Sequence, residues 1–198
     1  MTEKDPPSDR PPIPERPMLK AERIWLRPLE DRDMPAYAAG INDAAVGIPA
    51  GYRGPLSADQ ARAWLERQQE SVKRGDAFLF AVCELGDDRF IGTAWLHEVS
   101  WMDGSAELAI YMDNDHLGAG WGTEAVRTIV RFGFVSLGLM RIWLTVDAGN
   151  ARAIRSYEKV GFQKEGVMRQ SRRGLNGLAD SLLMAVLRDE WEAGPQTG

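Results

Sequence analysis

The chain has 198 residues, of which 44% are hydrophobic and 27% are charged, and its formal net charge is −5. This composition predicts a globular protein with one substantial core and no membrane span, because no apolar run approaches the roughly 18 residues that cross a bilayer. The N-terminus lacks the apolar region of a signal peptide, and a nucleic-acid partner would need a basic face. We therefore expect a cytoplasmic protein without membrane or nucleic-acid contacts.

Cysteine and histidine are scarce in this sequence. Cys83 is the single cysteine, so an intrachain disulfide is excluded. The two histidines, His97 and His116, lie too far apart for the spacing of metal ligands, and we expect no metal. The apolar neighbours of Cys83 in FAVCEL predict a buried strand residue.

Proline dominates the beginning of the chain. Residues 1–18 contain six of the eleven prolines and little that a core could bury. They are predicted to form a flexible or polyproline-like tail. The organisation that follows is a tail over 1–18, a single domain over 19–193 and a short C-terminal tail over 194–198.

The first regular elements are a strand and a long helix. Residues 21–29 alternate apolar Ile24 and Leu26 with arginines, as a strand with one buried face does. A helix is expected to begin after Ser57, a favourable N-cap, and to end before Gly75. Its apolar stripe comprises Ala61, Trp64, Leu65 and Val72.

Three further strands are predicted over residues 77–85, 89–99 and 106–114. Turn residues at 86–88 and 102–104 separate them, so they are expected to form an antiparallel meander. The glycine-rich sequence HLGAGWGTEA follows the third of these strands directly.

Three glycines stand where a helix begins. Gly118, Gly120 and Gly122 would let main-chain N–H groups approach a ligand closely, and a helix N-terminus adds unpaired donors and a partial positive charge. This combination favours a phosphate site. Glycines before a helix more often simply make a tight turn, so the flanking sequence has to decide.

The remainder of the chain alternates helices and strands. A helix is predicted over 123–138, a strand over 141–147, a helix over 150–160, and a final pair of strands over 161–173 and 178–191. The complete order predicts an α+β (mixed α/β) fold with one central sheet.

Residues 106–126 (AELAIYMDNDHLGAGWGTEAV) and 141–162 (RIWLTVDAGNARAIRSYEKVGF) together resemble the GNAT superfamily of acetyl-CoA-dependent N-acetyltransferases. The chain is most similar to the branch that holds ribosomal-protein N-terminal, spermidine and aminoglycoside-type acetyltransferases, from Ala21 to about Trp191. The resemblance implies a mixed sheet of about seven strands, splayed at the cofactor site and flanked by about four helices. It also implies direct transfer of an acetyl group from acetyl-CoA to a primary amine in a ternary complex.

The resemblance assigns the glycine turn to the CoA pyrophosphate. In the family this turn binds the pyrophosphate through backbone amides, and basic or glutamine side chains are frequent where this sequence has Leu117 and Ala119. The departure predicts moderate CoA affinity unless Arg127 or Arg155 supplies the charge. The residues of the cradle are Leu117, Gly118, Ala119, Gly120, Trp121, Gly122 and Thr123.

Four more residues are implied to bind the pantetheine arm. In the family the strand before the turn, here Ile110, Tyr111 and Met112, separates from its neighbour and pairs with that arm. Asn150 commonly hydrogen-bonds the arm, and it can also cap the helix that begins at Ala151, since the cap uses only the side-chain oxygen. An amide of Ile110 or Tyr111 would polarise the thioester carbonyl.

Two residues are implied to be catalytic. Tyr157 stands seven residues after Asn150, where many family members place a tyrosine close to the CoA sulfur, and it would protonate or hydrogen-bond the departing thiolate. Glu107 stands where some members carry the general base, although a glutamate at a strand end can also be a bystander.

Other candidates are weaker. His97 and Glu98 are the reserve candidates for the base, and Asp113 and Asp115 are poorer ones. An acetylated Cys83 is rejected because the family generally uses direct attack.

The amine is the least determined partner. In this fold the acceptor wall consists of about residues 31–75 and 166–180, and a polyamine, an aminosugar or a peptide N-terminus would suit it equally. The aromatic and acidic candidates of this region are Tyr37, Tyr52, Trp95, Trp101, Asp43 and Glu98.

Three alternatives stay open. The chain could bind CoA without catalysis, or it could use another donor such as succinyl-CoA, whose carboxylate would need a cation such as Arg152 or Arg169. Self-association as a homodimer could use the exposed final strands.

Overall fold

The computed structural model describes residues 17–48, 54–174 and 177–194. The tails predicted over 1–18 and 194–198 lie almost entirely outside these ranges. Among the described residues, no helix has the length and apolar character needed to cross a membrane.

The strands form one mixed sheet in the order β1-β2-β3-β4-β5-β6-β8-β7. Neighbouring strands are antiparallel except β5 and β6, which are parallel. The predicted meander is confirmed, and the sheet consists of the expected seven strands plus the two-residue β1. The strands are β1 (Leu19–Lys20), β2 (Ile24–Pro28), β3 (Phe78–Glu84), β4 (Phe90–Ser100), β5 (Ser105–Met112), β6 (Arg141–Asp147), β7 (Gln163–Gly174) and β8 (Gly177–Leu187).

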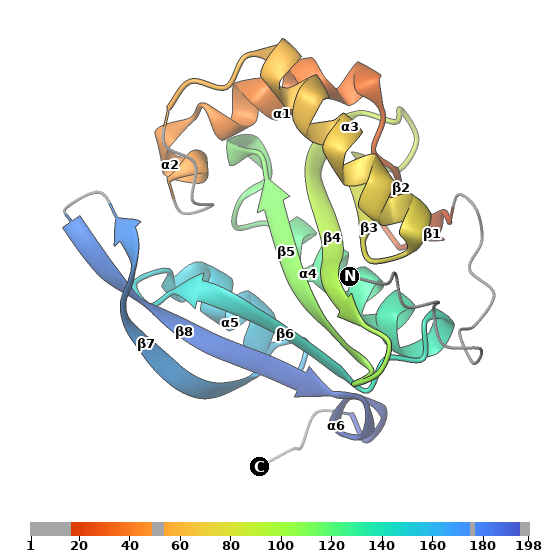
Figure 1. Cartoon of the computed structure of the whole chain (residues 1–198), viewed down its shortest axis with the longest axis vertical. Coiled ribbons are helices and arrows are strands. Elements are labelled where there is room, and N and C mark those ends of the chain that lie inside the picture. Colours follow the sequence, from red (N-terminus) through yellow and green to blue (C-terminus); the bar gives the residue numbers. More distant parts are fainter. Residues whose placement is uncertain (1–16, 49–53, 175–176, 195–198) are drawn as a thin grey trace, which may run out of the picture.

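The helices lie on both sides of this sheet (Figure 1). The longer ones are α1 (Met34–Ile41), α3 (Ala58–Arg74), α4 (Trp121–Arg131) and α5 (Ala151–Glu158). The short ones are α2 (Ala44–Gly47) and α6 (Arg188–Glu192), with 3₁₀ turns at η1 (Asp31–Asp33) and η2 (Asn114–His116) and a π turn at η3 (Phe132–Ser136). The last predicted strand ends earlier than expected, because the chain after β8 turns into α6.

Helix α3 shows how local sequence sets these boundaries. The Ser57 side chain accepts a hydrogen bond from the Gln60 amide, and Gly75 ends the helix in the left-handed conformation with φ of 68°. Both predicted ends are confirmed. The predicted stripe is only partly correct: burial is confined to the first half of the helix, around Ala61 and Leu65, and Val72 is 37% exposed.

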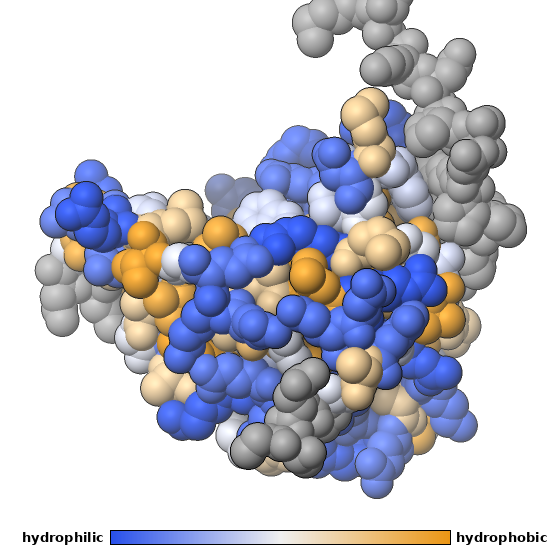
Figure 2. Space-filling model, turned by 90° about the horizontal axis from the view of Figure 1, so that it is seen from below, coloured by the Kyte–Doolittle hydropathy of each residue, from blue (hydrophilic) through white to orange (hydrophobic). Residues whose placement is uncertain are grey.

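Two cores cover the two faces of the sheet. The α1–α3 face packs Tyr37 and Leu65 against strand residues such as Leu79 and Cys83. The other face packs α4 and α5 against the remaining strand residues, with Phe80 among them. Cys83 is fully buried, as predicted. Seen from below, hydrophilic residues cover most of the surface, with apolar residues scattered among them (Figure 2).

The sheet opens between β5 and β6. These strands pair at three positions only, the last of which joins Glu107 to Trp143. Beyond that pair β6 stays with β8 as far as Asp147, whereas β5 stays with β4 (Figure 1). The predicted splay is therefore present, and Glu107 stands at its base.

Candidate active site

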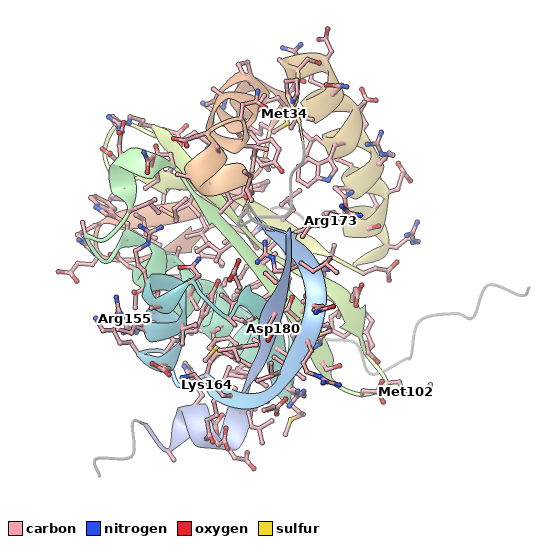
Figure 3. All side chains as sticks on the ribbon, turned by 90° about the vertical axis from the view of Figure 1, so that its left-hand side faces the viewer. Met34, Met102, Arg155, Lys164, Arg173 and Asp180 are labelled. Atoms are coloured by element: carbon pink, nitrogen blue, oxygen red, sulfur yellow. The ribbon has the colours of Figure 1, made fainter. Side chains whose placement is uncertain are left out.

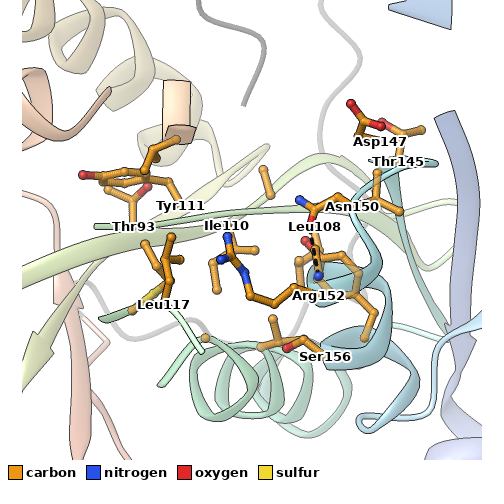
Figure 4. Close-up of a pocket in the computed structure, with 18 of the residues that line it drawn as sticks. Thr93, Leu108, Ile110, Tyr111, Leu117, Thr145, Asp147, Asn150, Arg152 and Ser156 are labelled. Atoms are coloured by element: carbon orange, nitrogen blue, oxygen red, sulfur yellow. Dashed lines mark hydrogen bonds between the residues drawn. The ribbon is translucent and has the colours of Figure 1, made fainter. Parts of the chain in front are cut away.

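A cavity of about 790 Å³ occupies the splay. Its walls come from β5 and the glycine turn on one side and from the end of β6 and α5 on the other, facing each other across the opening (Figure 4). Rings from α1, α3 and β4 complete the wall on the α1–α3 face. The cavity thus contacts elements from both faces of the sheet.

The pleat of β5 distributes its side chains between the two faces. Leu108, Ile110 and Met112 pack with the α4 side, whereas Tyr111 packs with α1 and α3. Because alternate residues of a strand share a face, Glu107 and Ala109 lie on the Tyr111 side. The register with β4 places Trp95 directly opposite Ala109.

Backbone geometry explains two of the three glycines. Gly118 and Gly120 have φ of 86° and 89°, in the left-handed region that favours glycine. Gly120 is the N-cap of α4 and provides no side-chain cap, so the first amides of this helix lack a side-chain acceptor. Arg155 of α5 and Lys159, the residue that follows α5, line the same cavity. An open helix end beside two basic side chains fits the diphosphate of CoA.

Arg23 supports the glycine turn from a distant part of the sequence. Its guanidinium donates to the Ala119 carbonyl at 3.1 Å and to Glu124 Oε2 at 2.9 Å, and its Cζ lies 4.7 Å from the centroid of the Trp121 ring. The Arg23 amide also donates to Glu124 Oε1 at 2.7 Å. This role could not be predicted from the sequence, because nothing near Arg23 indicates a partner about a hundred residues away.

Most residues assigned to the cofactor line the cavity, and two do not. Ala119 offers its carbonyl to Arg23, and the Trp121 ring packs edge-on against His116 at 5.5 Å. Both stabilise the turn without forming the wall. The cofactor candidates that line the cavity are Ile110, Tyr111, Met112, Leu117, Gly118, Gly120, Gly122, Thr123 and Asn150.

Asn150 forms the predicted helix cap and lies in the wall of the cavity. Its Oδ1 accepts from the Ala153 amide at 3.1 Å, which caps α5, and the side chain also lines the cavity. The cap leaves Nδ2 available to a ligand. Thr123 and Ser156 join α4 to α5 through a 2.7 Å hydrogen bond between their hydroxyl groups.

Tyr157 lines the cavity from α5 and is 9% exposed. Burial raises the pKa of its phenol to about 12, so the hydroxyl stays protonated at neutral pH. Its ring packs against Phe162 at 5.7 Å. A protonated phenol in this wall can donate a hydrogen bond into the cavity.

Glu107 lies in a group of three titratable residues. His97 Nε2 is 3.8 Å from Glu107 Oε2, and ligand atoms of His97, Glu98 and Glu107 all lie within 4.8 Å of one another. Burial, with a smaller contribution from the charge of Glu98, raises the pKa of Glu107 to about 7. Burial lowers the pKa of His97. A carboxyl group with this pKa can accept a proton near neutrality.

The group of His97, Glu98 and Glu107 could also bind a metal ion. One imidazole and two carboxylates at these separations could also hold a cation, which the spacing of the two histidines had not suggested. Only Glu107 of the three lines the cavity.

Comparison with known proteins now decides the family. The family described as "Acetyltransferase (GNAT) domain" matches residues 23–163. The probable N-acetyltransferase YjcK of Bacillus subtilis is 30% identical over 191 residues, which cover 88% of this chain and 99% of that protein. This chain belongs to the GNAT acetyltransferase family. It is an acetyl-CoA-dependent acyltransferase.

Two further matches are enzymes with named substrates. The spermidine N(1)-acetyltransferase of Escherichia coli is 28% identical over 158 residues, which cover 75% of this chain and 77% of that enzyme. A spermidine N-acetyltransferase from Vibrio cholerae, solved with CoA and spermine, has a TM-score of 0.78 at 23% identity and covers 86% of this chain and 98% of its own. The second likeness concerns the fold.

The arginines that were candidates for binding the pyrophosphate or a donor carboxylate differ in whether they line the cavity. Arg155 and Arg152 line the cavity, whereas Arg127 and Arg169 are not among the described residues of its wall. The carboxylate of Asp113 is hydrogen-bonded to the ring and the amide of His116, which leaves it poorly placed to act as a base.

His116 is a buried link that sequence analysis did not assign. Its Nε2 lies 2.8 Å from Glu84 Oε1, its Nδ1 is hydrogen-bonded to Asp113, and Arg89 Nη2 lies 3.3 Å from Nε2. Burial opposes the charge of the ring, but the hydrogen bonds to Asp113 and Glu84 outweigh it and raise the pKa of His116. The imidazole thereby ties the end of β3 to the start of the glycine segment.

The structure brings some of the candidate residues of the acceptor wall to the cavity and places others elsewhere. Tyr37 and Trp95 line the cavity. Trp64 lines it as well, although its place in the apolar stripe of α3 had predicted a core residue. Trp101 was misplaced: its indole donates to the Gly75 carbonyl and packs on Phe78, outside the described part of the wall. Tyr52 lies outside the described residues.

The two acidic candidates for binding the amine, Asp43 and Glu98, are not among the described residues that line the cavity. Asp43 caps α2 by accepting from the Ala45 amide at 2.8 Å. Glu98 lies beside Glu107 but is absent from the described wall of the cavity.

The β7–β8 hairpin closes the wall from the other side. Arg172 donates to the Ile48 carbonyl at 3.0 Å, and its Nη1 lies 3.6 Å from Asp147 Oδ2. Figure 3 shows the hairpin rising toward the layer that contains Met34, with Arg173 near its tip and Arg155 on the opposite side. The hydrogen bond to Ile48 joins β7 to the end of α2, and Arg172 lines the cavity.

Proposed function

We propose that this enzyme transfers the acetyl group of acetyl-CoA to a primary amine by direct attack. The observation that carries the proposal is one cavity that passes through the splay of β5 and β6, with the glycine turn at one face and Glu107 at the other. Acetyl-CoA supplies the activated thioester. An amine entering from the α1–α3 face would meet it at the base of the splay.

The main chain would bind the donor. The amides at the start of α4 would receive the pyrophosphate, with Arg155 and Lys159 adding positive charge. The part of β5 from Ile110 to Met112 pairs with β4 but no longer with β6, and its edge toward β6 would pair with the pantetheine arm. Asn150 Nδ2 would donate to that arm. An amide of Ile110 or Tyr111 would polarise the carbonyl.

Glu107 would remove the proton from the nucleophile. A primary ammonium group with a pKa near 10.4 is almost wholly protonated at neutral pH, so about 4 to 5 kcal/mol is needed to free its lone pair. The carboxylate would accept that proton and then release it to solvent. The carbon–nitrogen bond would form as the carbon–sulfur bond breaks.

Tyr157 would stabilise the sulfur that leaves. A thiol ordinarily has a pKa of about 8.5, well below the value of about 12 for this buried phenol. Tyr157 would therefore retain its proton and donate a hydrogen bond to the thiolate, which solvent protonates after release. This refines the two roles that the resemblance implied.

Release of free CoA tests the proposal. We would titrate thiol produced from acetyl-CoA against spermidine, an aminoglycoside, 2-phenylethylamine, propylamine and a short peptide, in EDTA to remove any contribution of a cation at the His97 group. Amine-dependent release is the expected result. Binding of acetyl-CoA without release for any amine would overturn the proposal, and a parallel series with succinyl-CoA tests the choice of donor.

Organisation and assembly stay proposals as well. We propose one domain over 19–193, a location in the cytoplasm, and a homodimer that uses the β7–β8 hairpin. The homodimer is supported by β7, which forms one edge of the sheet and exposes Val167. Sedimentation equilibrium of wild type and Val167→Lys would measure this, since loss of the dimer is expected in the variant.

A further inference from the structure

Four aromatic rings gather on the α1–α3 side of the cavity. Tyr37 stacks on Trp64 at 5.1 Å with an interplanar angle of 11°, and Trp64 meets Trp95 at 5.8 Å in an edge-on arrangement. Tyr111 completes the group, 5.8 Å from Tyr37. All four line the cavity. The two tyrosines are almost fully buried and the two indoles are half-buried, so the indoles form the surface that a ligand would touch.

This aromatic group is anchored to the rest of the fold. The hydroxyl of Tyr111 lies so close to Gly40 that a β-carbon there would come within 1.6 Å of it. The glycine therefore allows α1 to approach β5 and to hold Tyr37 against Tyr111. Rings fixed in this way lose little conformational freedom when a ligand binds.

The register relates these rings to Glu107. Trp95 lies opposite Ala109, and His97 lies opposite Glu107, all on one face of the sheet. Alternate residues of a strand are about 7 Å apart, so an amine at Glu107 has the indole of Trp95 within reach of a short linker. Ala109 carries only a methyl group and leaves space beside that indole.

Charge in the wall disfavours a polyamine. Among the described residues that line the cavity, Glu107 and Asp147 are the carboxylates, and Asp147 lies 3.6 Å from Arg172. Each further ammonium group of a polyamine would need a partner to offset its desolvation. The wall thus provides for one cation and for an apolar aromatic substituent.

We propose that the acceptor is an arylalkylamine, a molecule with one primary amine joined by two or three carbons to an aromatic ring. The amine lies at Glu107 and the ring packs against Trp95 and Trp64. The inference rests on the proposed function. In the reaction the amine nitrogen bonds to the acetyl carbon, and CoA leaves as a thiolate with the electron pair of the broken carbon–sulfur bond. The two protons lost by the ammonium nitrogen pass to Glu107 and to solvent, and solvent protonates the thiolate after release.

Substrate preference tests this inference. We would measure kcat/KM for 2-phenylethylamine, propylamine and spermidine with saturating acetyl-CoA. A value for 2-phenylethylamine at least tenfold above those for the other two is expected, because burying a phenyl ring against an aromatic wall contributes well over the 1.4 kcal/mol that a factor of ten represents. A preference for spermidine or propylamine would overturn the inference and leave the proposed function standing. Turnover of no amine at all would reject both.

Variants of the aromatic residues test whether the preference for 2-phenylethylamine arises from Trp95. Trp95→Ala should lower the ratio of kcat/KM for 2-phenylethylamine to that for propylamine by about tenfold, and Trp95→Phe should restore most of it. Trp101→Phe alters an indole outside the described wall and should keep the ratio. Equal losses for both amines in Trp95→Ala would contradict the inference. 2-Phenylethanol gives an independent readout, since it should inhibit competitively against propylamine in wild type and weakly in Trp95→Ala.

Discussion

The two faces of the splayed sheet build their parts of the cavity in different ways. On the α4–α5 face the candidate binding groups are mainly main-chain amides, presented by the glycine turn, the start of α4 and the part of β5 that no longer pairs with β6. On the α1–α3 face they are side chains from α1, α3, β4 and β5. A main-chain site needs particular backbone geometry, whereas a side-chain site can change one residue at a time. We infer that the first face binds a constant donor and the second determines the acceptor.

The faces meet at Glu107, and changing it should have the largest effect. Glu107→Gln keeps the size of the side chain but removes the carboxylate that we propose as the base, so kcat/KM for the amine should fall by about a hundredfold or more. In wild type, activity should rise with pH through an inflection at about 7, because the carboxyl group with a pKa of about 7 must be ionised to accept a proton. The variant should lack that inflection. Rates at pH 5.5 to 9 would measure both effects.

Glu98→Gln is the matched control for this pH profile. The charge of Glu98 contributes to the raised pKa of Glu107, so its removal should move the inflection to lower pH while the plateau at high pH persists. An unchanged profile in Glu107→Gln would show that another group is the base.

On the α4–α5 face, changing Tyr157 should have the next largest effect on the rate. Tyr157→Phe retains the packing against Phe162 and removes only the hydroxyl. We expect kcat to fall by about tenfold or more, with KM for acetyl-CoA within about twofold, because the hydrogen bond is needed when the thiolate leaves. Steady-state release of CoA measures both constants. A drop confined to KM would assign Tyr157 to binding instead.

Changing Arg23 should affect only the α4–α5 face, and by less than changing Tyr157. Arg23→Ala removes the side-chain hydrogen bonds to the Ala119 carbonyl and to Glu124 Oε2 and keeps the main-chain hydrogen bond to Glu124. It should loosen the turn without changing the α1–α3 face. KM for acetyl-CoA should rise about threefold to tenfold, as expected for one charge-assisted hydrogen bond at a partly exposed site. Arg188→Ala, which removes an ion pair with Glu192 on α6, is the control and should leave KM unchanged.

His116 should give the smallest effect, on stability. Because its pKa is raised in the folded state, the imidazolium stabilises the fold fully below the unfolded pKa of about 6.5, and this contribution is lost as pH rises through the folded pKa. His116→Gln should therefore lower the free energy of unfolding by about 1 kcal/mol at pH 6 and by less at pH 9. Asp113, Glu84 and Arg89 are the charged groups that face the ring. Urea unfolding at the two pH values measures the difference, and an equal loss at both would contradict the assignment.

The sequence predicted the α4–α5 face well for a physical reason. The left-handed backbone at Gly118 and Gly120 favours glycine, and the helix cap at Asn150 favours a side chain that can accept a hydrogen bond. Because these positions restrict the residue type, the sequence itself indicates them. The same holds for the ends of α3 at Ser57 and Gly75.

The α1–α3 face was predicted less completely, because its wall depends on packing between distant elements. Trp64 looks like any apolar residue of an amphipathic helix, and Trp101 looks as suitable as Trp95 until the strand register separates them. Arg23 was missed for a similar reason, since its partners at Ala119 and Glu124 lie far along the chain.

Crossed initial-rate kinetics would test most directly whether donor and acceptor occupy opposite faces of the splay. Acetyl-CoA and 2-phenylethylamine would both be varied for wild type, Arg23→Ala and Trp95→Ala. We predict that Arg23→Ala raises only KM for acetyl-CoA and that Trp95→Ala raises only KM for the amine. Variants that each change both constants to the same extent would contradict a cavity divided between the two faces of the sheet.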